Sequence, residues 1–468
     1  MPPSLALFLW LILLVALLRY DPAKTSKTSL ALWVPVIWLF IDGSRLPSQW
    51  LGGQVGAAVA NALEEGNSLD RAIWSALILL AIIILVSRSF QWGDFFARNL
   101  ALVTYLSFAL FSIFWSDFPF VSFKRWFRDL GSYLMIFVVL SDPRPLEAVR
   151  TVLRRLCYLL VPLSILLIKY YIGIGRHYDE WTGATAFVGA ATSKNMLGVL
   201  CLVSGLFFFW DTVTRWSDRN EQRTRWIFVN LSFTAMTLWL LIHAHSATST
   251  LCLALGCLVI AAAHSNVGQR HASLLKVVIP ACFCLYLILG FGFGINTELA
   301  GAVGRDPTFT GRTKIWDTLL GMHTDPLIGT GYGSFWLGPR LNLAMQKLGN
   351  VTEAHNGYLE IYLNLGIIGV FLLIVFLIVS YRSICQQLAS KESFASLALA
   401  LWTVLLFYMV TEAALRGGLL SVTFMLGAIT VSAARDTMPY QETQNEHAFD
   451  SGTVPIAHEA IFLEETPP

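Results

Sequence analysis

Long apolar runs recur along the whole chain, and they limit what it can fold into. Many of them approach the roughly 20 residues that an α-helix needs to cross a bilayer. Only 13% of the residues are charged, whereas a soluble globular protein carries about 25%. The chain therefore has too few charges for a water-exposed surface, and the sequence predicts an all-α polytopic membrane protein.

We expect 11 to 13 transmembrane helices, because two of the candidate spans are short. The candidate spans are residues 4–18, 29–41, 72–86, 100–115, 130–140, 156–172, 184–210, 226–242, 247–263, 274–294, 357–380, 394–412 and 417–433. The second and the fifth are the short ones. The first run lacks a basic segment before it and a small-residue cleavage site, so we expect a retained span rather than a signal peptide.

Lysine and arginine in the short loops predict the orientation, because cytoplasmic loops carry an excess of both. One alternating set of loops is basic and should face the cytoplasm. That set contains Arg19, Lys24, Lys27, Arg88, Arg98, Arg144, Arg150, Arg154, Arg155, Arg215, Arg219, Arg223, Arg225, Arg270, Lys276, Arg382 and Lys391. The long loop at residues 295–356 then lies on the outer face. The acidic tail at residues 435–468 is cytoplasmic, and we expect it to be disordered.

The end of the long loop carries polar residues into an apolar run, in the stretch EAHNGYLEIYLNLGIIGV at residues 353–370. At helical spacing, His355 shares a face with Gly366 and Gly369. Two glycines on one face let another helix approach closely. We therefore expect this face to look inward, with His355 at its outer end.

A polar stripe runs beside that face. Asn356, Glu360 and Asn364 follow one another at intervals of four residues. Polar groups inside a membrane are costly and usually face a cavity or a partner. The helix is therefore predicted to line a polar site that opens outward.

His355 has two possible roles on sequence grounds. It could be an interfacial histidine that bonds a loop carbonyl. It also lies near a predicted helix N-terminus, where the positive end of the helix dipole disfavours the imidazolium. A neutral histidine can accept a proton, as a general base must.

Arg312 begins an amphipathic piece of the long loop, in the stretch GRTKIWDTLLGM. An arginine near a helix start suits phosphate binding, because its planar fork pairs with two oxygens and stays charged. It could equally be a surface arginine. The stretch GTGYG at residues 329–333 lacks the strand and the Lys-Ser/Thr of a phosphate loop, so we expect a tight turn there.

Lys194 and Asn195 stand at the outer end of another predicted span, in TSKNMLG at residues 192–198. Arg176 precedes them in the same outer segment. Lys194 could instead extend to the membrane interface, as lysines at span ends commonly do.

Several other classes of site are not supported. The seven cysteines lie in or beside apolar runs without metal-binding spacing, so we expect small buried side chains. His243 and His245 are two residues apart, which is a poor spacing for shared metal ligation on a helix. Basic residues are spread among short loops, so nucleic-acid binding is not expected.

Together these stretches resemble the O-antigen ligase/polymerase family of bacterial envelope glycan assembly. His355-Asn356, nine residues and Gly366-Ile367-Ile368-Gly369 resemble the family signature at the end of its large periplasmic loop. GRTKIW resembles its arginine segment, with Arg312 as the arginine, and DPLIGTGYGSF resembles a glycine-rich stretch of the same loop. SKNMLG resembles the Lys-Asn-x-x-Gly element of the exopolysaccharide-polymerase branch.

One position departs from the pattern. Ligases of the family often carry Ser-Arg at the start of the span before the large loop, where this chain has Ser246-Ala247. Lys194 or Arg176 could supply the missing charge. The difference favours polymerases of the succinoglycan type over a strict ligase. The implied divisions are N-terminal transmembrane helices at 1–225, the ligase-like domain at 226–376 and C-terminal transmembrane helices at 377–434.

The resemblance implies a glycosyltransferase of the bacterial inner membrane with its active site facing the periplasm. Its donor would be an undecaprenyl-diphosphate-linked oligosaccharide, attacked with inversion by an acceptor hydroxyl, without a metal or another cofactor. His355 would be the general base or would position the acceptor, and Arg312 would offset charge on the departing diphosphate. The substrate-binding residues would be Lys194, Asn195, Arg176, Asn356 and Glu360.

Two alternatives remain at this stage. A ligase would attach the glycan to lipid A–core, whereas a polymerase would attach it to another lipid-linked glycan. A polysaccharide transporter or flippase would explain the many spans and intramembrane residues such as Glu360 and Glu412, although no inverted repeat is visible. Chain-length regulators and export proteins would be partners of a polymerase.

Overall fold

The computed structural model of the protein is helical almost throughout the residues that it describes. These are residues 1–20, 28–52, 67–88, 90–178, 185–216, 223–265, 272–292, 312–349, 351–390, 392, 394–415 and 417–429. They all belong to one compact unit, Met1–Val431. The predicted disordered tail and the first part of the long loop, residues 295–311, lie outside the described residues.

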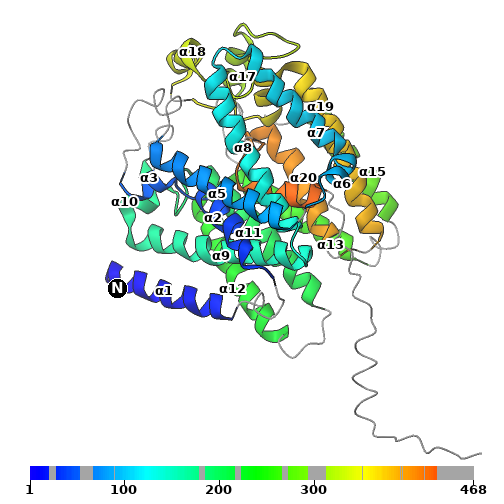
Figure 1. Ribbon diagram of the computed structural model, residues 1–468. Helices are drawn as coiled ribbons and strands as arrows, with labels where there is room; N and C mark the ends of the chain where they lie inside the picture. The colour runs from blue at the N-terminus through cyan, green and yellow to red at the C-terminus, as the bar shows by residue number, and fades with distance from the viewer. Residues whose placement is uncertain are drawn as a thin grey trace, which may run out of the picture. The chain divides into compact units, whose positions relative to one another are not determined.

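The chain folds into a succession of helices with one short hairpin (Figure 1). The α-helices are α1 Pro3–Arg19, α2 Trp33–Asp42, α3 Pro47–Trp50, α5 Ser68–Ser87, α6 Trp92–Arg98, α7 Leu100–Phe111, α8 Pro119–Leu140, α9 Pro145–Tyr170, α10 Ile172–Gly175, α11 Lys194–Arg215, α12 Arg223–Ala244, α13 Ala247–His264, α15 Ala272–Leu287, α17 Arg312–Leu320, α18 Gly338–Leu348, α19 Gly357–Ala389, α20 Ala395–Thr411 and α21 Leu419–Ala428. Two 3₁₀ helices, η2 Leu30–Leu32 and η3 Ser112–Trp115, and a π-helix, η4 Ile288–Gly292, complete the helical elements. Strands β1 Arg176–Tyr178 and β2 Thr185–Phe187 pair antiparallel, with Arg176 opposite Phe187.

The helices bear out the prediction of an all-α polytopic membrane protein. Among the described residues, six helices are long and apolar enough to cross a membrane: α5, α9, α11, α12, α13 and α19. A seventh span results if α6 and the helical segment Leu100–Trp115, which meet at 95°, are counted together. There are also five shorter apolar helices among the described residues. The total reaches the predicted range of 11 to 13 only when these are counted as spans.

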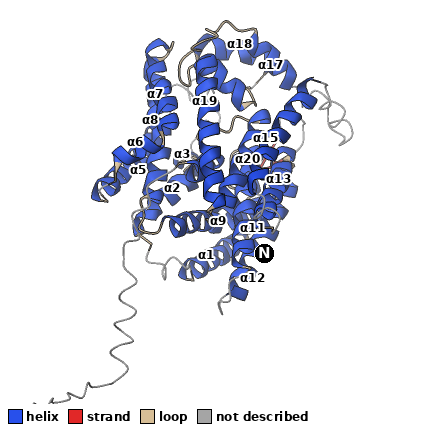
Figure 2. Ribbon diagram, turned by 90° about the vertical axis from the view of Figure 1, so that its right-hand side faces the viewer, coloured by secondary structure: helices blue, strands red, loops and turns tan. Residues whose placement is uncertain are grey.

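Burial separates inner helices from outer ones. Most residues of α9 and nearly all residues of α20 are buried, and α9 is horizontal in both views (Figures 1 and 2). Outer helices instead expose large apolar side chains, such as Val86 (73%), Phe228 (71%) and Leu251 (71%). Exposed apolar surface of this kind would be costly in water and suits contact with lipid.

Contrary to the prediction from the sequence, Arg154 and Arg155 do not lie in a short basic loop. The helix α9 begins earlier than predicted, and both arginines lie inside it and are buried. Arg154 donates to the buried Asp211 of α11 at 2.8 Å. Buried charges are retained when they are paired in this way, so the position of a basic residue in the sequence did not show its exposure.

The predicted glycine face of the helix at 357–380 is also different. Gly366 has φ 63° and ψ −166°, so α19 is broken there into two helical segments. A Cβ at Gly366 would lie 2.2 Å from the Leu327 carbonyl carbon. The element that approaches this glycine is therefore the backbone of a loop, and not another helix.

That loop is residues 326–333, and it is fastened to the break by backbone hydrogen bonds. Ile367 N donates to Pro326 O at 2.9 Å, and Gly331 N donates to Asn364 O at 2.9 Å. Trp115 of η3 donates through Nε1 to Ile328 O at 3.2 Å. Gly329, Gly331 and Gly333 all have positive φ, which confirms the predicted tight turn. Breaking α19 leaves backbone groups without helical partners, and the loop satisfies them.

The rest of the described long loop forms a separate small core. Helices α17 and α18 lie together at one end of the helices in both views (Figures 1 and 2). Their apolar sides pack around the fully buried Leu319, Phe335 and Leu341. The predicted amphipathic piece at Arg312 is confirmed as α17. This core holds Arg312 and His355 at its edges.

Candidate active site

The side chain of Glu412 is the centre of the candidate site. It follows α20 directly, and its side chain is 8% exposed. Arg312 donates from Nη2 to Oε1 at 2.6 Å. Asn195 donates from Nδ2 to both carboxylate oxygens, at 3.2 and 3.4 Å. His355 Nδ1 lies 3.3 Å from Oε2. Three residues from distant parts of the chain therefore meet on one buried carboxylate.

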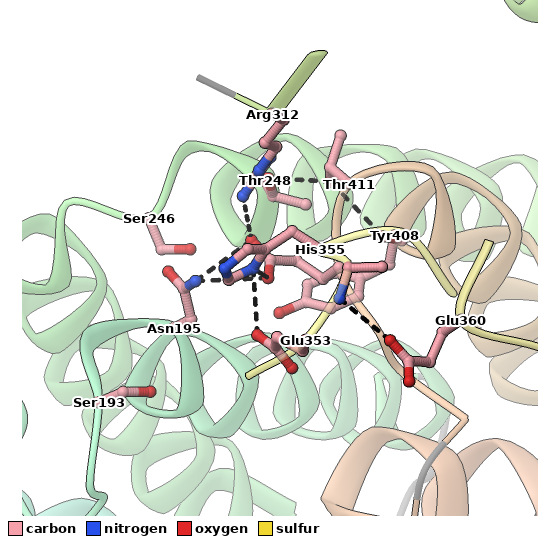
Figure 3. Close-up of polar contacts among 12 residues, drawn as sticks. Ser193, Asn195, Ser246, Thr248, Arg312, Glu353, His355, Glu360, Tyr408 and Thr411 are labelled. Carbon is pink, nitrogen blue, oxygen red and sulfur yellow. Dashed lines mark hydrogen bonds and ion pairs between the residues drawn. The ribbon is translucent and has the colours of Figure 1, made fainter. Parts of the chain in front are cut away.

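The spacing predicted that His355 lies on the helix, but His355 lies outside α19. The helix begins at Gly357, and His355 precedes it with a left-handed backbone, φ 47°. The ring is thereby turned between two carboxylates: Nδ1 is 3.1 Å from Glu353 Oε1 and 3.3 Å from Glu412 Oε2. Figure 3 shows Arg312, Asn195 and His355 pointing toward one another, with Glu353 beside the imidazole.

The charge of His355 also differs from the prediction. Burial alone would lower the pKa of His355, but hydrogen bonds and charge from Glu353 and Glu412 outweigh it and raise the pKa to about 9. The imidazole is therefore protonated at neutral pH, whereas the sequence predicted a neutral ring. The prediction from the helix dipole was wrong, because two carboxylates in contact with the imidazole change its pKa more than a helix end does.

A cavity of about 270 Å³ opens beside this cluster. His355, Glu353, Glu412 and Asn195 contribute its polar wall, and Tyr408 lies among them. Residues 417–420 and the end of α2 close the other side. The site therefore offers space next to two carboxylates, an imidazolium and an amide. One of the carboxylates, Glu412, also binds the Arg312 guanidinium.

Close packing between helix ends brings Asn195 to this place. A Cβ at Gly198 would lie 2.6 Å from Ser249 Oγ, so only glycine lets the start of α11 approach the start of α13. Thr248 of α13 in turn contacts Thr411 of α20, with 3.2 Å between the hydroxyl oxygens. This gives the Lys-Asn-x-x-Gly stretch a physical reason: the glycine allows the packing that presents the asparagine.

The polar stripe of α19 has a different role from the predicted one. Asn356 caps the helix, since its side-chain oxygen accepts from Tyr358 N and Leu359 N, each at 3.0 Å. Glu360 is 2% exposed and accepts from Trp336 Nε1 at 2.7 Å and from Ala354 N at 3.0 Å. Figure 3 shows Glu360 apart from the His355 cluster. The stripe braces the loop, and the polar cavity lies elsewhere.

The two other basic candidates do not line the cavity. Arg176 donates to Ile168 O at 3.0 Å, and its guanidinium lies 5.1 Å from the Phe187 ring centroid. Lys194 is the first residue of α11. Among the described residues that line the cavity, neither of them is present.

Three ligand-type side chains stand close enough to hold a metal ion. Ligand atoms of Glu353, His355 and Glu412 lie within 4.8 Å of one another, and two carboxylates with an imidazole suit several divalent cations. Two features oppose a cation here: the Arg312 guanidinium already occupies Glu412, and a ligating histidine must be neutral. Metal-independent chemistry stays a prediction, which chelation tests.

Two comparisons with known proteins bear on the family. Residues 232–374 match the family model described as O-antigen ligase. This segment is similar to the O-antigen ligase family. Over 317 residues, the chain is also 26% identical to the "Exopolysaccharide production protein ExoQ" of Rhizobium meliloti (strain 1021), an alignment that covers 64% of this chain and 68% of that protein.

The matched segment contains only part of the candidate site. Arg312 and His355 lie inside the matched segment, whereas Asn195 and Glu412 lie outside it. In the sequence, Glu412 stands out only as a polar residue within a membrane segment, and no pattern singles out Glu353. The position of Glu412 directly after an apolar run was the one signal available, since an ionisable residue there is a functional candidate by default.

Proposed function

We propose that the chain is a membrane glycosyltransferase of surface-polysaccharide biosynthesis. Its donor is an undecaprenyl-diphosphate-linked oligosaccharide, and transfer takes place at the periplasmic face of the inner membrane. The observation that carries the proposal is the convergence of Arg312, His355 and Asn195 on Glu412 beside a cavity. The matched segment and the similarity to ExoQ support the same class of activity.

The charges of the cluster suit an anionic leaving group. Two carboxylates, Glu353 and Glu412, face one guanidinium and one imidazolium, so the cluster has no net charge when His355 is protonated. A neutral His355 would leave a net negative charge that repels a diphosphate. Positive groups held in place in a water-poor site stabilise a developing anion without a metal.

The proposed reaction is a single displacement. The acceptor hydroxyl oxygen forms a bond to the anomeric carbon of the donor, and the bond from that carbon to the diphosphate oxygen breaks. The electron pair leaves with undecaprenyl diphosphate, next to Arg312 and the His355 imidazolium. The hydroxyl proton passes to Glu353, which lines the cavity and has a side chain that is 37% exposed.

This assignment replaces the general-base role expected for His355. A histidine that already carries its second proton cannot accept another, so a carboxylate is the better base at neutral pH. Glu412 and Asn195 are positioning residues in this proposal, because they hold Arg312 and His355. Lys194 and Arg176 remain proposed substrate-binding residues, either of which could supply the charge missing at Ala247.

The acceptor is proposed to be another glycan rather than lipid A–core. The name of ExoQ refers to exopolysaccharide production, and the Lys-Asn-x-x-Gly stretch supports the same branch. Chain-length regulators and export proteins are the expected partners. Reactions in vitro with a lipid-linked glycan and with lipid A–core, each as acceptor, would separate a polymerase from a ligase.

The proposal is tested by His355→Ala and Arg312→Ala in the source organism. Both variants are expected to lose long-chain surface polysaccharide while the protein remains in the membrane at normal amounts. The matched controls are His323→Ala and Arg340→Ala, because His323 is exposed and Arg340 of α18 pairs with Asp117 away from the cluster. Unchanged polysaccharide in both site variants would refute the proposed function.

A further inference from the structure

A second cavity adjoins the candidate active site and takes no part in the chemistry proposed above. Its volume is about 220 Å³. It lies against α2, α5, α8 and the start of α11. Asp42, Met196 and Gly417 belong to the walls of both cavities. A ligand in the second cavity would therefore lie next to the reacting groups.

The wall combines aromatic rings with groups that bond hydroxyls. Trp38 and Trp74 contact each other edge to face, with 4.2 Å between ring centroids, and Trp38 Nε1 donates to Ser132 Oγ at 3.2 Å. Asp42 Oδ2 is buried and has no hydrogen-bond partner among the described residues. The other polar lining residues are Ser44, Gln49, Arg128, Asp129 and Thr192. A buried carboxylate oxygen without a partner is costly, so a ligand that donates to it is expected to bind favourably.

The charges exclude the diphosphate end of the donor from this cavity. Arg128 is already paired, because its Nε and Nη2 donate to Asp129 Oδ1 at 3.1 and 3.0 Å. The other oxygen of Asp129 accepts from the Tyr332 hydroxyl at 2.7 Å. Two carboxylates against one paired guanidinium repel an anion. The two carboxylates suit a neutral ligand rich in hydroxyl groups, because hydroxyls donate hydrogen bonds that carboxylates accept.

We propose that this cavity is the subsite for one neutral sugar ring of the acceptor glycan, with Asp42 accepting hydrogen bonds from its hydroxyls and Trp74 packing against its apolar face. The volume of this cavity is below the roughly 300–1,000 Å³ of pockets for drug-sized ligands, which matches the smaller size of a single sugar ring. The shared wall places the next sugar of the acceptor in the active-site cavity. This inference rests on the proposed function and assigns the acceptor side of it.

The test is the dependence of transfer on acceptor concentration. The protein in lipid nanodiscs would receive saturating lipid-linked donor and, as acceptor, the oligosaccharide released from the surface polysaccharide of the source organism. Asp42→Asn is expected to raise the KM for this acceptor about tenfold or more, as the loss of a hydrogen bond to a charged group does. The KM for the donor and the kcat are expected to stay within about twofold of the wild-type values. A larger change in either would contradict the subsite assignment.

Matched variants make the result specific. Asp94→Asn makes the same chemical change on α6, where Asp94 pairs with Arg98 outside both cavities, and should leave all constants unchanged. Thr192→Val removes a hydroxyl from the wall with little change in shape, and it should also raise the acceptor KM. This second variant keeps the test valid even if Asp42→Asn proves unstable. Calorimetry with the same oligosaccharide and no donor should show weaker binding to each cavity variant.

The outcomes separate this inference from the proposed function. If His355→Ala and Arg312→Ala abolish transfer while Asp42→Asn and Thr192→Val behave like Asp94→Asn, the subsite is refuted and the proposed function stands. A change in the donor KM alone, or in kcat alone, would also overturn the acceptor assignment. If the His355 and Arg312 variants transfer normally, the proposed function itself is refuted.

Discussion

The charge of His355 gives the sharpest single test of the site. The rise of its pKa from 6.5 to about 9 corresponds to about 3 kcal/mol, at roughly 1.4 kcal/mol per pKa unit. This energy is what Glu353 and Glu412 together supply beyond the opposing effect of burial. The variant Glu353→Gln removes one of the two carboxylates and keeps the size of the side chain.

We expect Glu353→Gln to lower the pKa of His355 by about one unit or more. Titration of the histidine signals by nuclear magnetic resonance measures this directly. The chain has nine histidines, and the spectrum of His355→Gln identifies the relevant signal. Asp94→Asn is the control, because it removes a carboxylate paired with Arg98 on α6. A wild-type pKa for His355 at or below 6.5 would refute the reasoning and would restore the neutral general base.

The same shift predicts how stability and activity depend on pH. The folded-state pKa is raised, so the stabilisation from the imidazolium pairs is fully present below pH 6.5 and is lost as the pH rises through about 9. Transfer activity should fall over the same upper range, since the imidazolium is lost. An increase of activity through pH 9 would instead indicate that His355 acts as the base.

Further predictions follow from the packing and the charges. Glu412→Ala leaves buried positive groups without their partner and should destabilise the protein by about 3 kcal/mol, whereas an unchanged melting temperature in detergent would contradict this role. Gly366→Ala should cost about 2 kcal/mol or more in the same assay, because φ is 63° and the Cβ would meet the Leu327 carbonyl. Glu360→Ala should cost about 2 kcal/mol and make the loop easier to cleave by protease, and resistance equal to the wild type would show that it does not brace the loop. Chelators should leave transfer unchanged, since positive groups oppose a cation at the cluster; a loss restored by added divalent metal would overturn that prediction.

The sequence by itself determined the membrane class and several local elements. Apolar runs specify lipid-crossing helices through hydrophobicity alone, so the helical class was predictable. Local patterns also located the amphipathic helix at Arg312 and the turn at residues 329–333. The stretch around His355 pointed to the correct part of the chain, because polar residues beside a membrane segment are costly unless they serve a purpose.

The tertiary structure alone decided how the site is built. Glu412 is 57 residues from His355 and 100 from Arg312, and no periodicity links positions so far apart. The charge of His355 depends on those contacts, which explains why a helix-end argument gave the opposite sign. The break at Gly366 depends on a loop that folds back from before the helix. Local spacing determines helices because the forces that form them act between near neighbours, whereas a site made by side chains from four separate segments exists only after those segments have packed.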